Sequence, residues 1–329
     1  MCADQQDLYA DMIRSRRKNV VGGITAAYYG PSIGQIQTIQ HGVKGKVFAA
    51  SDKNLYMTEL HYDGKGPAAH FWAGKFATLN KSGDELPDEK GSDKKLPAYN
   101  DAIVYLTLPQ EITQYKAFGI FCKQAAVDFG HAELPPNFKL PKEQSLGKLT
   151  AKVGTATAAD VILKDSATMQ LSQFEYDASC AGSSFFMAAP DKTTPADKMT
   201  KLQYGGKTDK LEKFAKKDVM LMLPAGHHWN EFKWFSVYCV DTKASHAELD
   251  IDMGKSEMVP VHIATTTGPG GPDHGPPHTD SDDKTKNGGK SKGDAAMHAL
   301  FVLHISRVRL LCALIMDDKI PVVTRRDIP

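Results

Sequence analysis

The chain lacks the marks of several common protein classes. None of its five cysteines belongs to a CxxC pair, which argues against a zinc ribbon or a thioredoxin-type site. Forty basic residues against thirty-nine acidic ones leave a net charge of +1, so the charge footprint of a general nucleic-acid binder is missing. No GxSxG, HExxH, phosphate-loop or dinucleotide motif occurs. We therefore expect a protein that is not an enzyme and that binds no cofactor, metal ion or nucleic acid.

Long apolar runs are also missing. Residues 1–20 contain no apolar core of about 7–15 residues, so no secretory signal is recognised there. The uncharged run 295–306 is too short to cross a bilayer, and we expect no membrane attachment. Apolar residues at helical spacing within the tail 295–329 predict an amphipathic helix, and the lysine-rich segment 209–217 predicts a second helix.

What the chain does contain is an internal repeat. Short sequences recur in the same order 114 to 117 residues later: Tyr-Asp at 62–63 and 176–177, Leu-Pro at 108–109 and 223–224, and Phe-Cys at 121–122 as Tyr-Cys at 238–239. The tetrapeptide His-Ala-Glu-Leu occurs at 131–134 and again at 246–249. Collinear matches at a nearly fixed offset predict tandem copies of one domain, each large enough for its own core.

These matches divide the chain into five parts. We expect a leader over 1–30, a first domain over 31–136, a second and divergent domain over 146–253, a disordered Gly/Pro/Asp/Lys linker over 258–294, and the tail. Inside each repeat, short β-rich runs alternate with turn residues, which is typical of an antiparallel sandwich or jelly roll. The predicted fold is all-β, with two tandem β-sandwich or jelly-roll-like domains.

One predicted strand carries a cysteine in both repeats. Lys-x-Phe-x-Ile-x-Cys at 116–122 matches Lys-x-Phe-x-Val-x-Cys at 233–239. Because side chains alternate along a strand, Cys122 and Cys239 share a face with apolar residues, which favours two buried, inert thiols. A redox or ligand role for these two cysteines is the alternative. Cys180 has no counterpart in the first repeat, where Gly66 stands, and a Cys180–Cys239 disulfide is a further hypothesis.

The Tyr-Asp loop of the first repeat is the second candidate site. An Asp-Gly turn and a Gly-Pro pair favour a tight turn packed under aromatic residues. The functional alternative is a surface that stacks on a sugar or a peptide, formed by Tyr62, Asp63, Gly64, Gly66, His70 and Trp72. In the second repeat the glycines are absent and Phe186 takes the place of Trp72, so the first repeat is expected to bind better.

Two His-x-Glu pairs are candidates for the start of a metal site. His131 with Glu133, and His246 with Glu248, lie two residues apart and therefore on one face of a strand. No third ligand is visible in the sequence near either pair. Exposed strand residues are the favoured interpretation, and no metal site is predicted.

Several stretches together resemble one known family. The order Tyr-Asp-Gly-x-Gly-Pro at 62–67, Phe-Trp-Ala-Gly at 71–74, Leu-Pro-Asp-Glu at 86–89 and Val-Asp-Phe-Gly-His at 127–131 is similar to the DM-thirteen domain. That small β-domain occurs in tandem in the animal proteins Skeletor and Knickkopf. The resemblance covers about residues 26–252 and is weaker in the second repeat. Relatives usually carry a DOMON domain after the pair, and none is recognised in this sequence.

The resemblance implies a non-enzymatic, extracellular protein of the Skeletor and Knickkopf type that associates with cuticle or matrix. Chitin or matrix components would be its partners, and the first repeat would make the main contact. The alternative is an electron-transfer module, the role proposed for the family, using Cys122 and Cys239. An intracellular or nuclear role is a third hypothesis, since no signal peptide is recognised. The sequence does not indicate an oligomeric state.

Overall fold

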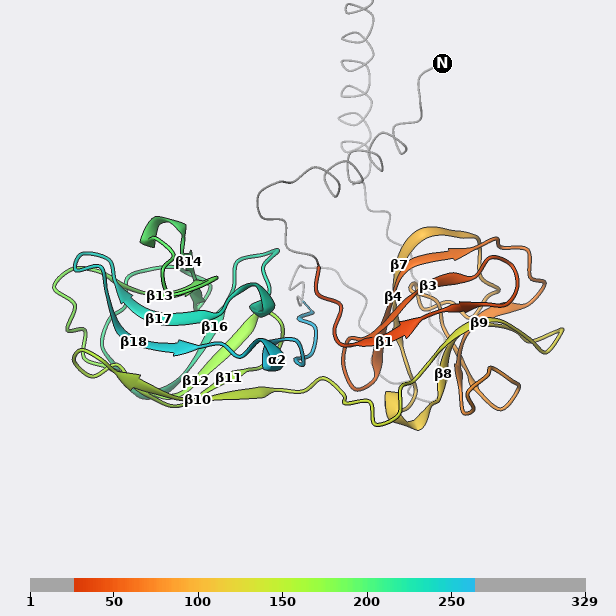
Figure 1. The fold of residues 1–329 in the computed structure, drawn as a ribbon, viewed down its shortest axis with the longest axis horizontal. Coiled ribbons are helices and arrows are strands. Elements are labelled where there is room, and N and C mark those ends of the chain that lie inside the picture. Colours follow the sequence, from red (N-terminus) through yellow and green to blue (C-terminus); the bar gives the residue numbers. More distant parts are fainter. Residues whose placement is uncertain (1–26, 264–329) are drawn as a thin grey trace, which may run out of the picture. The chain divides into compact units, whose positions relative to one another are not determined.

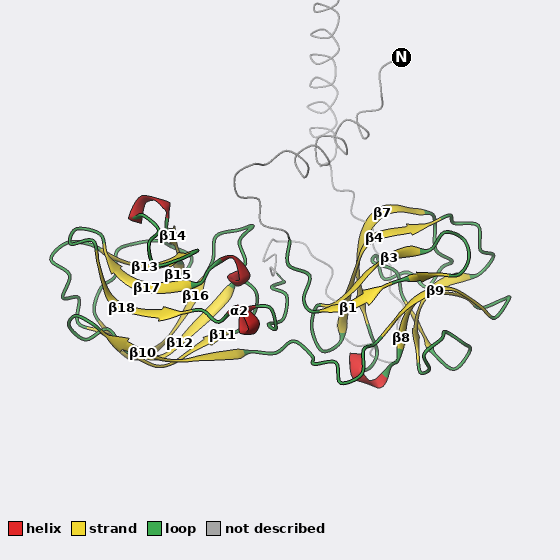
Figure 2. Cartoon of the chain, in the orientation of Figure 1, coloured by secondary structure: helices red, strands yellow, loops and turns green. Residues whose placement is uncertain are grey.

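The computed structural model describes residues 27–263, which contain two β-domains, one for each repeat (Figure 1). Antiparallel strands form nearly all the regular structure of this part of the chain, with α2 (Met253–Ser256) its one short α-helix (Figure 2). The predicted all-β fold is therefore confirmed. The predicted linker over 258–294, apart from its first residues, and the predicted tail helix lie outside the described residues.

The first repeat is a sandwich of two antiparallel sheets. One sheet has the order β1 (Ser32–Gln35), β3 (Lys44–Ala49), β4 (Asn54–Tyr62), β7 (Tyr99–Thr107). The other has the order β2 (Gln37–Thr38), β9 (Val127–Glu133), β8 (Ala117–Cys122), β5 (Ala69–Gly74), β6 (Asp84–Leu86). A single buried cluster takes side chains from both sheets, for example Met57 from β4 and Ile120 from β8.

The second repeat has a corresponding set of strands, except that β10 replaces β1 and β2 and that β15 is additional, and its two faces are joined into one nine-stranded sheet. The order is β14 (Thr200–Lys201), β13 (Ser184–Ala189), β17 (Trp234–Cys239), β18 (Ala244–Asp250), β10 (Gln144–Ala151), β11 (Ala158–Leu163), β12 (Thr168–Tyr176), β16 (Phe214–Met222), β15 (Gln203–Tyr204). β10 makes the connection, because it pairs with β11 between Gln144 and Leu149 and with β18 through its last two residues.

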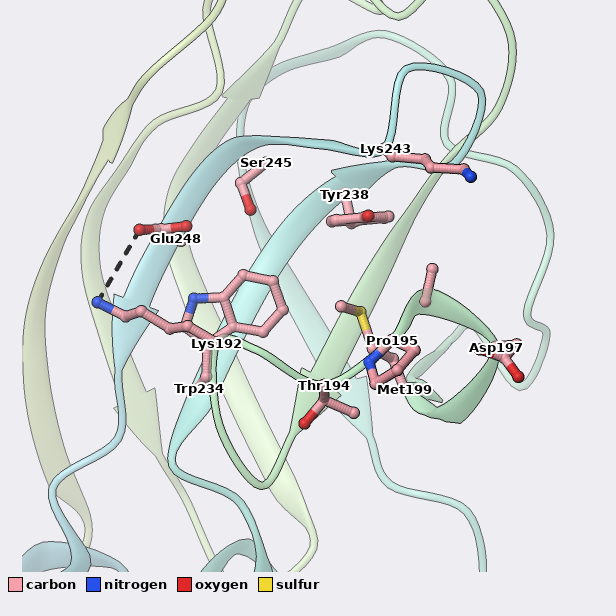
Figure 3. Close-up of a pocket in the computed structure, with 11 residues that line it drawn as sticks. Lys192, Thr194, Pro195, Asp197, Met199, Trp234, Tyr238, Lys243, Ser245 and Glu248 are labelled. Atoms are coloured by element: carbon pink, nitrogen blue, oxygen red, sulfur yellow. Dashed lines mark ion pairs between the residues drawn. The ribbon is translucent and has the colours of Figure 1, made fainter.

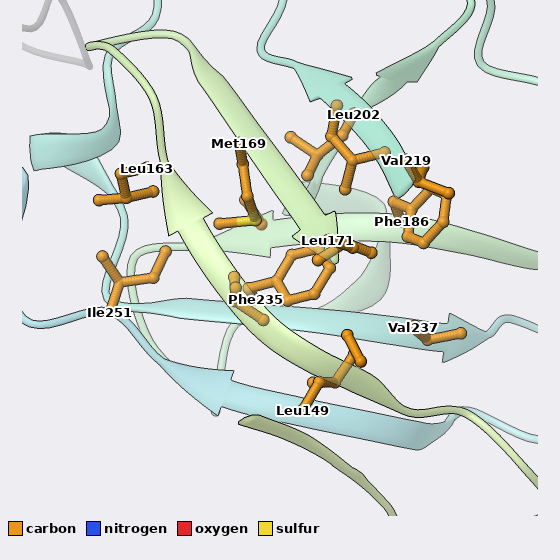
Figure 4. Close-up of a cluster of buried hydrophobic side chains, with 14 of the residues drawn as sticks. Leu149, Leu163, Met169, Leu171, Phe186, Leu202, Val219, Phe235, Val237 and Ile251 are labelled. Carbon is orange, nitrogen blue, oxygen red and sulfur yellow. The ribbon is translucent and has the colours of Figure 1, made fainter. Parts of the chain in front are cut away.

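The core of the second repeat lies between these faces. Phe186 of β13 and Phe235 of β17 point toward Leu171 of β12 and Val219 of β16 (Figure 4). Each of these side chains is 1% exposed or less, and burying one such group contributes about 1.5–3 kcal/mol.

The helix predicted over 209–217 is wrong. Residues 209–213 have no regular structure, and β16 starts at Phe214. Phe214 is buried against Phe174 and Tyr204, whereas Lys216 and Lys217 are exposed. Pairing with β12 supplies the backbone hydrogen bonds of this segment and outweighs the weak helix propensity of its lysines.

Strand pairing fixes which residues of the two repeats correspond. On β8 and β9, Gly119 pairs with His131; on β17 and β18, Ser236 pairs with Glu248. Residues of β17 and β18 therefore correspond to residues of β8 and β9 that lie 117 positions earlier in the chain. The His-Ala-Glu-Leu match has an offset of 115, so it is two residues out of the structural register. The structural counterpart of His131 is therefore Glu248.

The same comparison corrects a second match. Phe71 pairs with Ile120, and Phe186 pairs with Val237, so Phe71 corresponds to Phe186. Trp72 then corresponds to Met187 rather than to Phe186. Backbone details agree with these registers, because non-glycine residues with positive φ occur at matched positions: Glu59 and Gln173, Asp101 and Lys216, Ala126 and Lys243.

Candidate functional site

The two cysteines of the repeated strand occupy equivalent, fully buried positions. Cys122 ends β8 opposite Ala69 and Val127, and Cys239 ends β17 opposite Ser184 and Ala244. Both are 0% exposed. The predicted apolar strand face is therefore present in both repeats, and both cysteine side chains are buried in it.

The cysteines differ in what they contact. Cys239 is joined to Cys180 by a disulfide with a Cα–Cα distance of 5.8 Å, which is within the usual range for such bonds. Cys122 is a free, buried thiol. Cys180 lies in the loop between β12 and β13 and is only partly buried. Cys239 is thus not the free thiol that the redox hypothesis assumed, and Cys122 has no equivalent partner within residues 27–263.

Gly66 explains why the first repeat has no such disulfide. It aligns with Cys180 at the 114-residue offset of the Tyr-Asp pair, in a loop that is one residue shorter, and its N–H donates to Tyr62 Oη at 2.8 Å. A Cβ atom at Gly66 would lie 2.6 Å from both Phe129 Cε2 and Tyr62 Oη. Those distances are too short for any side chain without movement of its neighbours. The loop glycine and the aromatic rings around it are therefore packed as one unit.

His246 is the third member of the site in the second repeat. It lies at the bulge of β18, where the register between Val237 and Tyr238 shifts by one residue. Donor atoms of Cys180, Cys239 and His246 all lie within 4.8 Å of one another. The bulge re-aims the His246 side chain toward the disulfide. Its counterpart in the first repeat is Phe129, which has no ligand atom.

Hydrogen bonds fix the loop that carries Cys180. Asp177 accepts from the backbone N–H groups of Ser179 and Thr155, at 3.0 and 2.9 Å. Hydrogen bonding from Ser179, followed by that from Thr155, lowers the pKa of Asp177. Ser179 Oγ in turn lies 3.2 Å from Nδ1 of His246. Loop and histidine are therefore held in one network that leads from an exposed carboxylate to the disulfide.

A cavity of about 320 Å3 adjoins the Cys180 side of the disulfide. Two lysines, Lys210 and Lys213, belong to its lining together with Glu212. Lysine side chains stabilise a nearby thiolate and attract anionic molecules. Cys180 is thus the sulfur that a reactant in solution reaches first, and Cys239 lies behind it.

The predicted stacking surface of the first repeat is not assembled. Tyr62 is 2% exposed and belongs to the core between the sheets. His70 and Trp72 lie on the opposite face of β5, and they are 8% and 6% exposed. Asp63 is exposed and paired with His41 at 3.0 Å, and its loop neighbour Gly64 has the positive φ of a turn. No aromatic ring among the predicted residues presents a free face to solvent.

A loop covers Trp72. Its indole N–H donates to the carbonyl of Asn80, and its ring packs with Phe121 and Leu79 in a small buried cluster. His70 lies beside it, with Nδ1 2.7 Å from Glu85. Burial lowers the pKa of His70, while the Glu85 carboxylate opposes that effect. These side chains form a second, minor core of the first repeat.

The equivalent face of the second repeat is hollowed. A cavity of about 570 Å3 lies over β17 and β18, with Trp234 and Tyr238 among its lining residues (Figure 3). Lys192 and Glu248, 3.9 Å apart, stand at its edge. Trp234 Nε1 is buried and has no hydrogen-bond partner among the described residues. Sequence reasoning missed this pocket, because no motif marks it.

Comparison with known families gives two matches on this chain. The family model described as "Electron transfer DM13" matches residues 35–134 and 150–251. The chain belongs to the DM13 family. The matches coincide with the two β-domains, so the tandem DM-thirteen prediction is confirmed.

Two curated relatives carry the name Protein Skeletor, both from Drosophila melanogaster. Isoforms B/C and isoforms D/E are each 29% identical to this chain over 222 residues, which is 66% of its length. The chain spans 28% and 15% of the lengths of these relatives. No solved structure matches the chain. None of the helices in the described part of this DM13 protein is long and apolar enough to cross a membrane.

Proposed function

We propose that this DM13 protein is an electron-transfer module and that Cys180 and Cys239 of its second repeat are the reacting couple. The observation that carries the proposal is the partly exposed disulfide beside His246 and the lysine-lined cavity. The family description supports the same chemistry. Cys122, one of the two predicted redox cysteines, is then a core residue of a repeat that lacks the couple.

The chemistry is thiol–disulfide exchange with a dithiol partner. A partner thiolate attacks Sγ of Cys180, which forms a mixed disulfide and expels Cys239 Sγ as a thiolate. His246, next to that sulfur, supplies a proton or a positive charge to the leaving thiolate. The second thiol of the partner then attacks its own mixed-disulfide sulfur and releases Cys180. Two electrons have passed to the protein, and the partner leaves as a disulfide.

The test is reversible reduction of the folded full chain in dithiol buffers, followed by alkylation and peptide mass analysis. We expect Cys180 and Cys239 to become labelled while the circular dichroism spectrum stays native. Cys122 serves as the internal control and should label only after unfolding, since it is 0% exposed. If the disulfide resists reduction until the domain unfolds, it is a structural bond and the proposal fails.

The proposed location is extracellular. Disulfides form and persist in oxidising compartments and are rare in the cytosol, so the Cys180–Cys239 bond favours the extracellular prediction over the nuclear one. Expression of the natural transcript in animal cells, with separate assay of medium and cell extract, tests this location. Recovery of the protein from the nucleus alone, with free thiols, would contradict it.

Association with a polysaccharide matrix is a second candidate function, favoured by the pocket in Figure 3. A cavity with aromatic residues and a charged edge is a common setting for carbohydrate binding. We expect Lys192→Ala and Tyr238→Ala to weaken retention of the full chain on chitin. Lys201→Ala, which removes a lysine of β14 outside the pocket lining, is the matched control. Equal retention of all variants would remove the pocket from consideration.

A further inference from the structure

We infer that the reduced second repeat binds a thiophilic metal ion of the Zn2+ type through Cys180, Cys239 and His246. The inference rests on the proposed function in one respect, namely that the disulfide opens in the folded protein. It departs from the sequence-based expectation of no metal site. The reason is that the fold brings together three ligands that lie 59 and 7 residues apart in the chain.

The ligand types fit such an ion. Two thiolates and one imidazole form a donor set that binds Zn2+ in preference to harder cations. The three donor atoms already lie within 4.8 Å of one another. In a tetrahedral zinc site with the usual bond lengths, two sulfurs are separated by about 3.8 Å. Breaking the S–S bond and moving the sulfurs apart by about 2 Å therefore produces the required spacing without a change of fold.

The surroundings orient the imidazole ligand. Ser179 Oγ lies 3.2 Å from Nδ1 of His246, which leaves Nε2 as the nitrogen available to a metal ion. Metal-bound histidines commonly have their second nitrogen fixed in this way. The ring of Tyr176, with its centroid 6.1 Å from that of His246, packs edge-on against the imidazole. The histidine is 3% exposed, so it would not need to be ordered when the ion binds.

The fourth position is left to water or to an incoming ligand. Cys180 is partly exposed and adjoins the cavity that contains Lys210 and Lys213. An open coordination position on that side would be reachable from solvent. Binding converts two thiols and one Zn2+ ion into a bis-thiolate complex with release of two protons, so affinity must fall as the pH is lowered.

The first repeat is a built-in negative control. Strand register places Cys122 and Phe129 at the positions of Cys239 and His246, and Gly66 aligns with Cys180 in sequence, so the first repeat offers a single thiol there. The substitutions Cys180→Gly and His246→Phe therefore introduce residues that this fold already accepts at those positions. His246→Gln is a second variant that keeps a polar side chain. Cys122→Ala removes the remaining thiol of the described residues and leaves the proposed site intact.

The experiment uses the full chain, reduced with a phosphine and freed of metal, with Co2+ as the spectroscopic probe and Zn2+ as the competitor. We expect one equivalent of Co2+ to give a sulfur-to-cobalt charge-transfer band, which Zn2+ abolishes. Cys180→Gly, His246→Phe and His246→Gln should each weaken binding at least about tenfold. Cys122→Ala should bind as the parent chain does. The oxidised protein should give no band.

Each result decides one point. Cysteines and histidines outside the described residues are present in every variant, so only the difference between variants counts. Reduction with free, labelled Cys180 and Cys239 but no band would overturn the metal site and leave the electron-transfer proposal standing. Protein expressed in a reducing cytosol has free thiols at Cys180 and Cys239 from the start. Metal binding by that protein would therefore support the metal site even if the disulfide of the oxidised protein could not be reduced. A band that survives all three variants would assign the ion elsewhere and overturn the inference.

Discussion

The two repeats share a backbone and differ in their chemistry. Strand order, registers and even the positions of positive φ correspond between them. Yet the second repeat has a disulfide, a histidine and an open pocket where the first has a glycine, a phenylalanine and a covering loop. A few substitutions at the end of one strand and its neighbouring loop therefore separate a packed structural domain from a candidate reactive one.

The direction of this difference was unexpected. The first repeat keeps the sequence pattern of the family better, and it was predicted to be the better binder. In the structure its characteristic residues are packing residues: Gly66 makes room for Phe129, and Trp72 is closed over by Leu79. The more divergent repeat carries the accessible chemistry.

Removing the disulfide should have the largest effect on this comparison. Cys180→Ala releases a covalent loop closed over a sequence separation of 59 residues, which we expect to destabilise the second repeat by about 4 kcal/mol. Denaturant titration of the variant and parent chains measures the loss. Alkylation of Cys122 during the same titration reports unfolding of the first repeat, whose midpoint should not move. A shift of both midpoints would show that the repeats unfold together.

Truncating the side chain that covers Trp72 in the first repeat should have the next largest effect. Leu79→Ala removes the side chain that packs on Trp72 and should cost about 3 kcal/mol, mostly through the cavity it leaves. Thermal denaturation measures the change. Phe76→Ala, on the same covering loop but 57% exposed, is the control and should change stability by less than about 0.5 kcal/mol. Equal effects of the two variants would mean that the loop does not close a core.

Transfer of the cysteine site to the first repeat should have a moderate effect. Gly66→Cys alone should cost about 2 kcal/mol, because the new Cβ would meet Phe129 and Tyr62 at 2.6 Å. The double variant Gly66→Cys, Phe129→His relieves one of those contacts and should form a disulfide to Cys122. Mass analysis before and after reduction detects the bond. A double variant that folds but keeps both thiols free would show that the loop geometry of the two repeats differs more than their sequences indicate.

The smallest effect concerns pH. Burial lowers the pKa of His70, so the unfolded first repeat binds more protons than the folded one as the pH falls. The associated stability is therefore present above the ordinary histidine pKa of about 6.5 and is lost as the pH falls below it. Denaturant titrations at several pH values should show that the free energy of unfolding decreases as the pH falls. The variant His70→Phe, which carries the residue found at the corresponding position 185 of the second repeat, should show a smaller decrease. A slope unchanged in the variant would assign the effect to another group.

Much of the fold was predictable because it follows from local pattern. Runs such as Leu55–Leu60 and Phe232–Cys239 are short, rich in β-forming residues and separated by turn residues; the structure has β4 over the first and β17 over Trp234–Cys239 of the second. The error in matching the two repeats came from register. A tetrapeptide identity suggested that His131 and His246 correspond, but a strand position is defined by its partner across the sheet, and there His131 matches Glu248. Identity over four residues is weaker information than the register of a whole strand pair.

The sequence by itself determined the two domains, their β-class and the burial of the cysteine strand, since periodicity and repetition are local properties that packing then obeys. Tertiary structure alone decided which residues meet. Cys180 and Cys239 are joined across a hairpin-rich domain, and a one-residue bulge turns His246 toward them. Because side-chain direction changes with each residue along a strand, such a site depends on register and on bulges, and these are fixed only when the sheets have formed.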